Sequence, residues 1–181
     1  MQAICRFVKR RRCFGVAILW VCVQILWVGA LTPAFAAPTT LPTVNAQQGT
    51  GAYALTLQEQ KAVMLLNESR KAEGLEPLKV NLRLAKLAAD YAMDMNKRKF
   101  FAHIDPDGKD PFDRMAAIGI DLPNEGENIA LSPDVETAHK MLMESPLHRE
   151  NILNPKFAEI GIGVRPDSRG GIYLVQEFVG P

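Results

Sequence analysis

The sequence holds only three cysteines among 181 residues, and none lies beyond residue 22. All three precede Ala34-Phe35-Ala36, where small residues alternate in the pattern that a signal peptidase accepts. Cleavage after Ala36 would leave a chain that cannot form an internal disulfide, even in a compartment that permits one. The fold of the exported protein must then be held by its hydrophobic core alone.

Clustered positive charge is also missing beyond the first twelve residues. Arg6 and the run Lys9-Arg10-Arg11-Arg12 supply 5 of the 21 Lys and Arg side chains, and residues 1–36 contain no acid. Without that segment the chain carries 16 basic and 20 acidic side chains, a net charge of −4. Because nucleic-acid binding depends on clustered Lys and Arg that neutralise phosphates, this balance excludes nucleic acid as a partner.

Residues 1–36 have the organisation of a secretory signal peptide. The positive cluster precedes an apolar run from Cys13 to Leu31, and Pro33 breaks the run just before the small residues. We therefore expect a secreted or cell-envelope protein that is cleaved after Ala36. The run is long for a signal peptide, so a retained anchor is the alternative, and it would be the protein's one contact with the membrane.

The remaining chain divides into a linker and one domain. Residues 37–55 are rich in Pro, Thr, Gln and Gly without an apolar period, which predicts a flexible linker. Residues 56–181 are long enough for a single core. Four helix-start signals fall in the first part of this domain: the capping box Thr56-Leu57-Gln58-Glu59, then Asn81, Asp110-Pro111 and Ser132-Pro133.

Each predicted helix has an expected end or an expected apolar face. The first should stop at Gly74, and the second carries an apolar stripe that includes Leu84, Tyr91 and Met95. The fourth should end at Ser145-Pro146. Residues 159–164 and 172–178 have strand character and flank a turn-rich link, which predicts an antiparallel hairpin. Helices followed by strands indicate an α+β fold.

Five segments in order resemble the successive signatures of the CAP superfamily, named after cysteine-rich secretory proteins, antigens and pathogenesis-related proteins. The resemblance is to the short, cysteine-free bacterial branch, and it covers residues 57–178. The segments are Leu66-Asn67-Glu68-Ser69-Arg70 with Gly74-Leu75-Glu76-Pro77-Leu78, Phe101-Ala102-His103, Gly126-Glu127-Asn128-Ile129-Ala130, Ser145-Pro146-Leu147-His148-Arg149-Glu150-Asn151-Ile152-Leu153, and the tail 159–164 with 173–178.

This resemblance implies a three-layer α-β-α sandwich with one polar cleft. Carried over by motif, the cleft residues are His103, Glu127 and His148. Ser145 stands where animal and plant members have a second glutamate, and its neighbour Glu144 is a further candidate. Leu142 and Leu147 replace the Trp and Gly usual in bacterial relatives, which implies a cleft rim of different shape.

Two histidines and a carboxylate are ligands that suit a divalent cation, with zinc favoured. His103, Glu127 and His148 are therefore candidate metal ligands, although their long spacing is unlike a compact H-E-x-x-H motif. The alternative is that the histidines only satisfy a buried polar cluster. The aspartates at 105, 107, 110 and 113 do not follow the order of an EF-hand loop, and turn and cap roles explain them better.

Three functions fit these residues. The first is a binding module for a small apolar, peptide or cell-wall ligand. The second is a metal-dependent hydrolase, such as a peptidase, in which Glu127 is the candidate catalytic base. The third is a structural envelope protein. The missing second glutamate and the lack of a G-x-S-x-G nucleophile motif favour binding over catalysis. His139 is interpreted as part of a solvated helix face.

Overall fold

The computed structural model describes residues 2–10 and 53–181. The strands are β1 (Gln2–Arg10), β2 (Lys79–Val80), β3 (Asn124–Ser132), β4 (Glu159–Pro166) and β5 (Ile172–Gly180). They form one sheet in the order β1-β3-β5-β4-β2. β1, β3, β5 and β4 pair antiparallel, whereas the short β2 runs parallel to β4.

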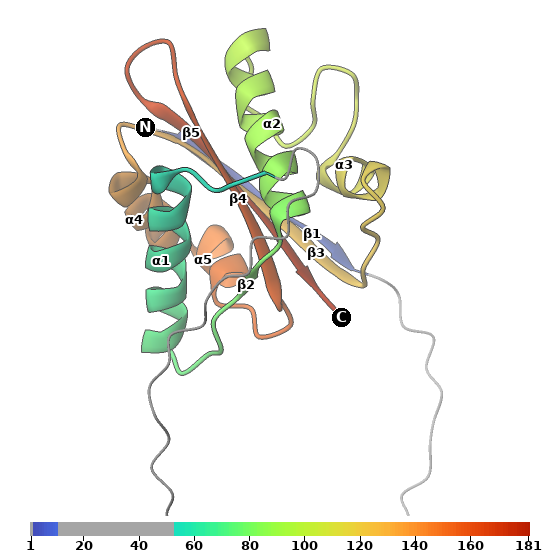
Figure 1. Cartoon of the computed structure of the whole chain (residues 1–181), viewed down its shortest axis with the longest axis vertical. Coiled ribbons are helices and arrows are strands. Elements are labelled where there is room, and N and C mark those ends of the chain that lie inside the picture. The colour runs from blue at the N-terminus through green and yellow to red at the C-terminus, as the bar shows by residue number, and fades with distance from the viewer. Residues whose placement is uncertain (1, 11–52) are drawn as a thin grey trace, which may run out of the picture. The chain divides into compact units, whose positions relative to one another are not determined.

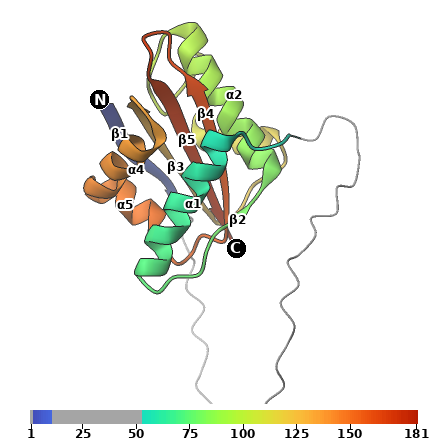
Figure 2. The same cartoon turned by 60° about the vertical axis from the view of Figure 1, so that its left-hand side comes forward.

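Helices cover both faces of this sheet. α2 (Leu82–Arg98) and α3 (Pro111–Ala117) lie on one face, and α1 (Leu57–Ala72), α4 (Val135–Glu144) and α5 (Pro146–Ile152) lie on the other (Figures 1 and 2). The cores follow this division, with Leu66 and Leu142 buried beneath α1 and α4 and Tyr91 and Met95 buried beneath α2. The structure therefore confirms the predicted three-layer α-β-α sandwich.

The alternating glycines of β4 allow α2 to lie directly on the sheet. A Cβ atom at Gly161 would stand 2.2 Å from the Leu84 carbonyl carbon, and one at Gly163 would stand 2.2 Å from that of Ala88. Both distances are far inside van der Waals contact, so only glycine permits this approach. The Gly-x-Gly of the β4 segment thus sets the spacing between the two layers.

Three of the four predicted helix starts are confirmed. Thr56 and Asp110 each form a capping box, and the side chain of Asn81 accepts hydrogen bonds from two free backbone N–H groups at the start of α2. The fourth start was misplaced, because Ser132 ends β3 and Asp134 caps α4. Asp134 accepts a hydrogen bond from the Thr137 N–H, so the cap falls two residues later than the Ser-Pro signal suggested.

Neither α5 nor β3, the elements that carry His148 and Glu127, was recognised in the sequence. The segment after Ser145 continues as α5, although we had interpreted Ser145-Pro146 as an ending; proline is also suited to the first turn of a new helix. The motif around Glu127 forms β3, which is almost wholly buried. The strand was not predicted because the first half of its sequence is polar. The predicted β4–β5 hairpin is confirmed, and it extends to Pro166 and Gly180.

Most of the predicted signal peptide and linker lies outside the described residues. Residues 2–10 form β1, which pairs with β3 and is interrupted by an irregularity between Ile4 and Phe7. Within residues 2–10 and 53–181, no helix is both long enough and apolar enough to span a bilayer. Cleavage after Ala36 stays a prediction, as does the alternative of a retained anchor.

Candidate functional site

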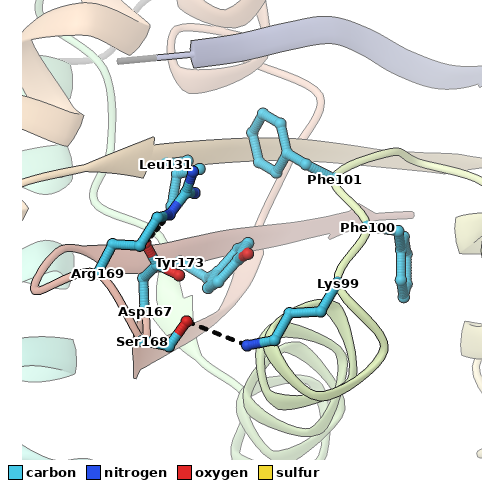
Figure 3. Close-up of a pocket in the computed structure, with 8 residues that line it drawn as sticks. All are labelled: Lys99, Phe100, Phe101, Leu131, Asp167, Ser168, Arg169 and Tyr173. Atoms are coloured by element: carbon cyan, nitrogen blue, oxygen red, sulfur yellow. Dashed lines mark hydrogen bonds and ion pairs between the residues drawn. The ribbon is translucent and has the colours of Figure 1, made fainter.

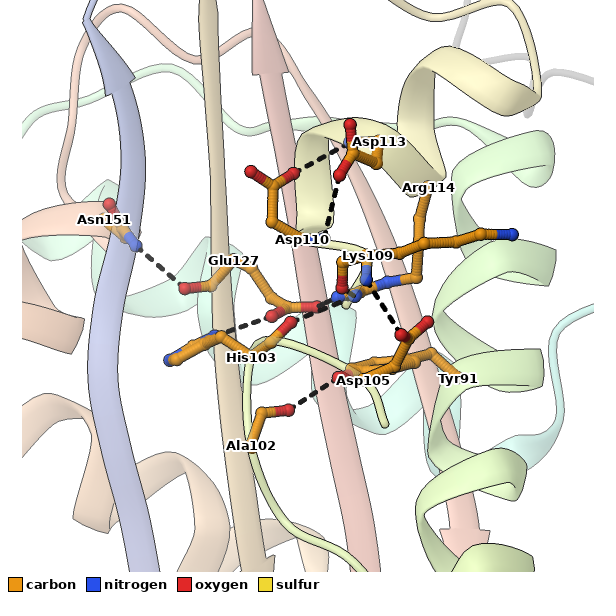
Figure 4. A network of polar contacts seen from close by, with 10 residues as sticks. All are labelled: Tyr91, Ala102, His103, Asp105, Lys109, Asp110, Asp113, Arg114, Glu127 and Asn151. Carbon is orange, nitrogen blue, oxygen red and sulfur yellow. Dashed lines mark hydrogen bonds and ion pairs between the residues drawn. The ribbon is translucent and has the colours of Figure 1, made fainter. Parts of the chain in front are cut away.

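The carboxylate of Glu127 is the centre of a buried ionic cluster on the α2–α3 face of the sheet (Figure 4). Its Oε1 atom lies 2.6 Å from His103 Nδ1, and its Oε2 atom accepts a hydrogen bond of 2.7 Å from Arg114 Nη2. Glu127 is fully buried, and His103 and Arg114 are each 7% exposed. Because a carboxylate only accepts hydrogen bonds, Nδ1 of His103 is the donor in this pair.

Arg114 holds the cluster together through several contacts. Its Nη1 atom donates to the carbonyl oxygens of His103 and Lys109, both at 3.0 Å, and the guanidinium carbon lies 3.5 Å from the centre of the Tyr91 ring. Burial opposes the guanidinium charge, but the nearby carboxylates, Glu127 first, outweigh it and raise the pKa of Arg114. Arg114 therefore fixes the His103 loop and neutralises Glu127 at once.

A second carboxyl group, that of Glu177, lies directly across from Glu127 in the β3–β5 register. Glu177 is fully buried, and neither of its carboxyl oxygens has a hydrogen-bond partner among the described residues. Burial, followed by the negative charge of Glu127, raises the pKa of Glu177 well above its usual range. Two adjacent carboxyl groups beside one arginine favour the protonated form of Glu177 over the ionised form.

His148 belongs to a second polar group, which forms around Asn128 on the opposite face of β3. Asn128 Nδ2 donates to the carbonyl oxygen of His148 and to Oε1 of Gln176, both at 3.1 Å. Asn151 Nδ2 in turn donates to Asn128 Oδ1 at 2.9 Å and to the Glu127 carbonyl oxygen at 3.3 Å. Neighbouring residues of a strand point to opposite faces, so Glu127 and Asn128 divide the two groups between the layers.

The structure thus brings together only part of the predicted site. His103 and Glu127 are in direct contact, whereas the His148 ring contacts Ser145 Oγ through Nδ1 at 2.7 Å. Ser145 is the residue that ends α4, so within residues 53–181 this contact joins the His148 ring to α4 and not to Glu127. Glu144 is exposed and lies 3.8 Å from Lys140.

Two neighbouring expectations were wrong. Leu142 is fully buried in the core and does not line a rim, while Leu147 is 45% exposed. His139 is half-buried and its Nε2 atom lies 2.8 Å from Ser69 Oγ, which joins α4 to α1. Burial lowers the pKa of His139, so this histidine is not on a solvated face.

The side chains do not fit a three-ligand metal site of His103, Glu127 and His148 as they stand. Both oxygens of Glu127 are engaged, one by His103 and the other by Arg114. Among the described residues, no group of three or more His, Cys, Asp and Glu side chains is arranged to hold a metal ion. Glu127 is instead placed as a carboxylate that orients His103, a role common behind a histidine ligand.

Arg114, Glu177 and Asn151 are the site residues that the sequence analysis missed. A signal existed for Glu177, since Gln176-Glu177 interrupts an otherwise apolar strand that is buried along its whole length. Arg114 gave no such signal, because an arginine in a short amphipathic helix is ordinarily a surface residue. Its burial is decided by the packing of α3 against β3.

Comparison with known proteins agrees with this architecture. Residues 63–178 match the model of the CAP family, described as the cysteine-rich secretory protein family. The Bacillus subtilis (strain 168) protein YkwD, described as uncharacterised, is 38% identical over 145 residues, which cover 80% of this chain and 53% of YkwD. This chain therefore spans about half the length of that relative.

Solved structures show the same fold. An extracellular protein containing an SCP domain from Bacillus anthracis str. Ames superposes with a TM-score of 0.63 at 27% identity, over 68% of this chain and 40% of that one. An outer surface protein of Borrelia burgdorferi superposes with a TM-score of 0.62 over 71% of this chain and 97% of its own, and at 21% identity it supports the fold alone. With the family match across most of residues 56–181, these findings establish that the chain belongs to the CAP family of cysteine-rich secretory proteins.

Proposed function

We propose that this protein is an exported binding module that holds its ligand beside β3, at His103 and His148. The buried ionic cluster of His103, Glu127 and Arg114 is the observation that carries the proposal. Replacing such a cluster with well-packed apolar residues often leaves a protein at least as stable, so a contribution to stability does not by itself explain why the cluster is present. Clusters of buried ionisable side chains in contact with one another are typical of functional sites.

The surroundings of the two histidines indicate the chemistry of the ligand. Ile104, next to His103, is 51% exposed, and Leu147, next to His148, is 45% exposed. Each imidazole is therefore adjacent in sequence to an apolar side chain at the surface. This combination suits a peptide, or another ligand that offers both apolar surface and hydrogen-bonding groups.

Removal of residues 1–36 would also take away β1, which pairs with β3 in the sheet.

Co-purification tests this proposal directly. The exported protein should carry a peptide, lipid or glycan that mass spectrometry identifies after denaturation. The double variant His103→Ala/His148→Ala should lose that ligand, whereas Asp90→Asn, which changes an exposed carboxylate of α2, should retain it. A wild-type protein recovered without any bound molecule, or a double variant that keeps the full amount, would contradict the proposal.

The orientation of His103 by Glu127 favours a metal-dependent hydrolase as a second candidate. With Nδ1 donating to Glu127, Nε2 is the ring nitrogen whose lone pair would coordinate zinc. The ion pair with Arg114 argues against Glu127 as a general base, because both of its carboxylate oxygens are already engaged, one by His103 and the other by Arg114.

Titration calorimetry with zinc chloride separates the two candidates. The hydrolase requires a single site that His103→Ala and His148→Ala each abolish, with binding that weakens as the pH falls, because protons compete with the metal for the imidazole nitrogens. It also requires that Glu127→Gln remove hydrolysis of a peptide substrate. Absence of heat at micromolar zinc would reject the hydrolase and leave the binding module unaffected.

A further inference from the structure

A cavity of about 310 Å³ opens at the end of the sheet where the turn joins β4 to β5. The three residues that follow α2, the β4–β5 turn and the start of β5 line the cavity, together with Leu131 of β3 (Figure 3). Leu131 lies four residues along β3 from Glu127, roughly 13 Å at the usual rise of a strand. The cavity is thus separate from the ionic cluster, and its volume suits a small molecule.

The floor of the cavity is aromatic. The rings of Phe101 and Tyr173 have centroids 6.3 Å apart and are tilted by 54°. Phe101 and Leu131 are only half-buried, so part of their apolar surface faces the opening. Figure 3 shows the Tyr173 ring between the two sides of the cavity. A flat apolar group placed there would remove this surface from water and pack edge or face against two rings.

The rim carries an unbalanced positive charge. Lys99 Nζ donates to Ser168 Oγ at 3.1 Å and to Asn96 Oδ1 at 3.3 Å, and both acceptors are neutral. No ion pair within residues 53–181 involves Lys99. The neighbouring Arg169 is already paired with Asp167 at 2.9 Å. An anionic group at the opening would therefore meet one ammonium that has no acidic partner in this part of the chain.

The left-handed backbone conformation of Lys99 indicates that its side chain has a role besides ending α2. Lys99 ends α2 with φ of 60°, and it is the one non-glycine residue in the described ranges with a positive φ. Residues with a Cβ atom are disfavoured in this left-handed conformation, where glycine or asparagine is usual. Strain of this kind is found most often where a side chain serves a site.

We propose that this cavity binds a small aromatic carboxylate. Its ring lies against Phe101 and Tyr173, and its carboxylate accepts hydrogen bonds from Lys99 Nζ. The same chemistry is offered by a free aromatic acid and by the C-terminus of a peptide that ends in an aromatic residue. This site is independent of the ligand proposed for the two histidines.

Nuclear magnetic resonance titration with 3-phenylpropionate tests the site. We expect saturable shifts at Lys99, Phe101 and Tyr173 with a Kd on the order of millimolar, because a ligand of this size gains little per atom. The amide 3-phenylpropanamide, which lacks the charge, and propionate, which lacks the ring, should each bind at least about fivefold more weakly. N-acetyl-glycyl-phenylalanine should bind more tightly than 3-phenylpropionate if the natural ligand is a peptide C-terminus, and no more tightly if it is a free acid.

Lys99→Asn is the decisive variant, because asparagine tolerates the left-handed conformation and keeps the fold while it removes the ammonium. We expect its affinity for 3-phenylpropionate to fall about fivefold with no loss of thermal stability. Lys97→Asn removes the same charge from an exposed position two residues away and should leave the affinity unchanged. No saturable shift at millimolar probe, equal binding of the amide, or equal loss in the two variants would overturn the proposal.

Discussion

Replacement of Glu177 by glutamine should make the protein more stable at neutral pH, although it removes a charged residue type from the core. Glu177 is fully buried opposite Glu127, and the arginine of the cluster is bonded to Glu127. Burial and the charge of Glu127 raise the pKa of Glu177 well above its usual range. Glutamine has nearly the shape of the protonated side chain and does not titrate.

The size of the effect follows from proton linkage. In the unfolded chain Glu177 loses its proton near pH 4.3, whereas in the folded protein it keeps the proton to a higher pH. Between these values the folded state binds one proton more, so the free energy of unfolding falls by about 1.4 kcal/mol for each unit of rising pH. The stability advantage of Glu177→Gln over the wild type should therefore be larger at pH 7 than at pH 5, with a slope of at most about 1.4 kcal/mol per pH unit.

Urea unfolding of both proteins at pH 5, 6 and 7 measures this difference. Glu144→Gln provides the control, because it removes an exposed carboxylate and leaves the buried carboxyl group of Glu177 in place. Infrared spectroscopy at pH 7 should also show the band of a protonated carboxyl group in the wild type and not in Glu177→Gln. Parallel stability curves, with no such band, would show that Glu177 is ionised and that the charge balance of the cluster differs from our interpretation.

Two further predictions concern the fold around the site. Gly163→Ala should destabilise the protein by about 3 kcal/mol in urea unfolding, since its Cβ atom would overlap the α2 backbone, whereas Gly108→Ala has open space and should lose only about 1 kcal/mol through its positive φ. Glu59→Gln should cost about 1–2 kcal/mol at pH 7. Burial opposes ionisation of Glu59, but hydrogen bonds from Tyr53, Thr56 and Val164 outweigh it and lower its pKa. That stabilisation is present above the unfolded pKa and is lost as the pH falls through the folded pKa, so the two proteins should converge in stability as the pH is lowered. Equal stability at pH 7 would contradict this role.

Local signals in the sequence were sufficient for much of the fold. The capping residues Thr56, Asn81 and Asp110 mark helix starts because their side chains satisfy backbone N–H groups within three residues. The β4–β5 hairpin was likewise visible from its apolar runs and the turn between them. The start of α4 was misjudged because Asp134, which follows Ser132-Pro133, is an equally good cap and only the end of β3 selects between them.

The two candidate histidines and Glu127 were identified from motifs, which say nothing of how their side chains are shared out in space. The sequence by itself determined three of the helix starts, the hairpin, the family and the choice of these three residues as candidates, because those depend on local chemistry and on order along the chain. Tertiary structure alone decided that Arg114 and Glu177 join Glu127 while His148 lies with Asn128. The reason is that neighbouring residues of a strand point to opposite faces of the sheet. Only the packing of α3 on one face and α5 on the other determines which side chains each of them contacts.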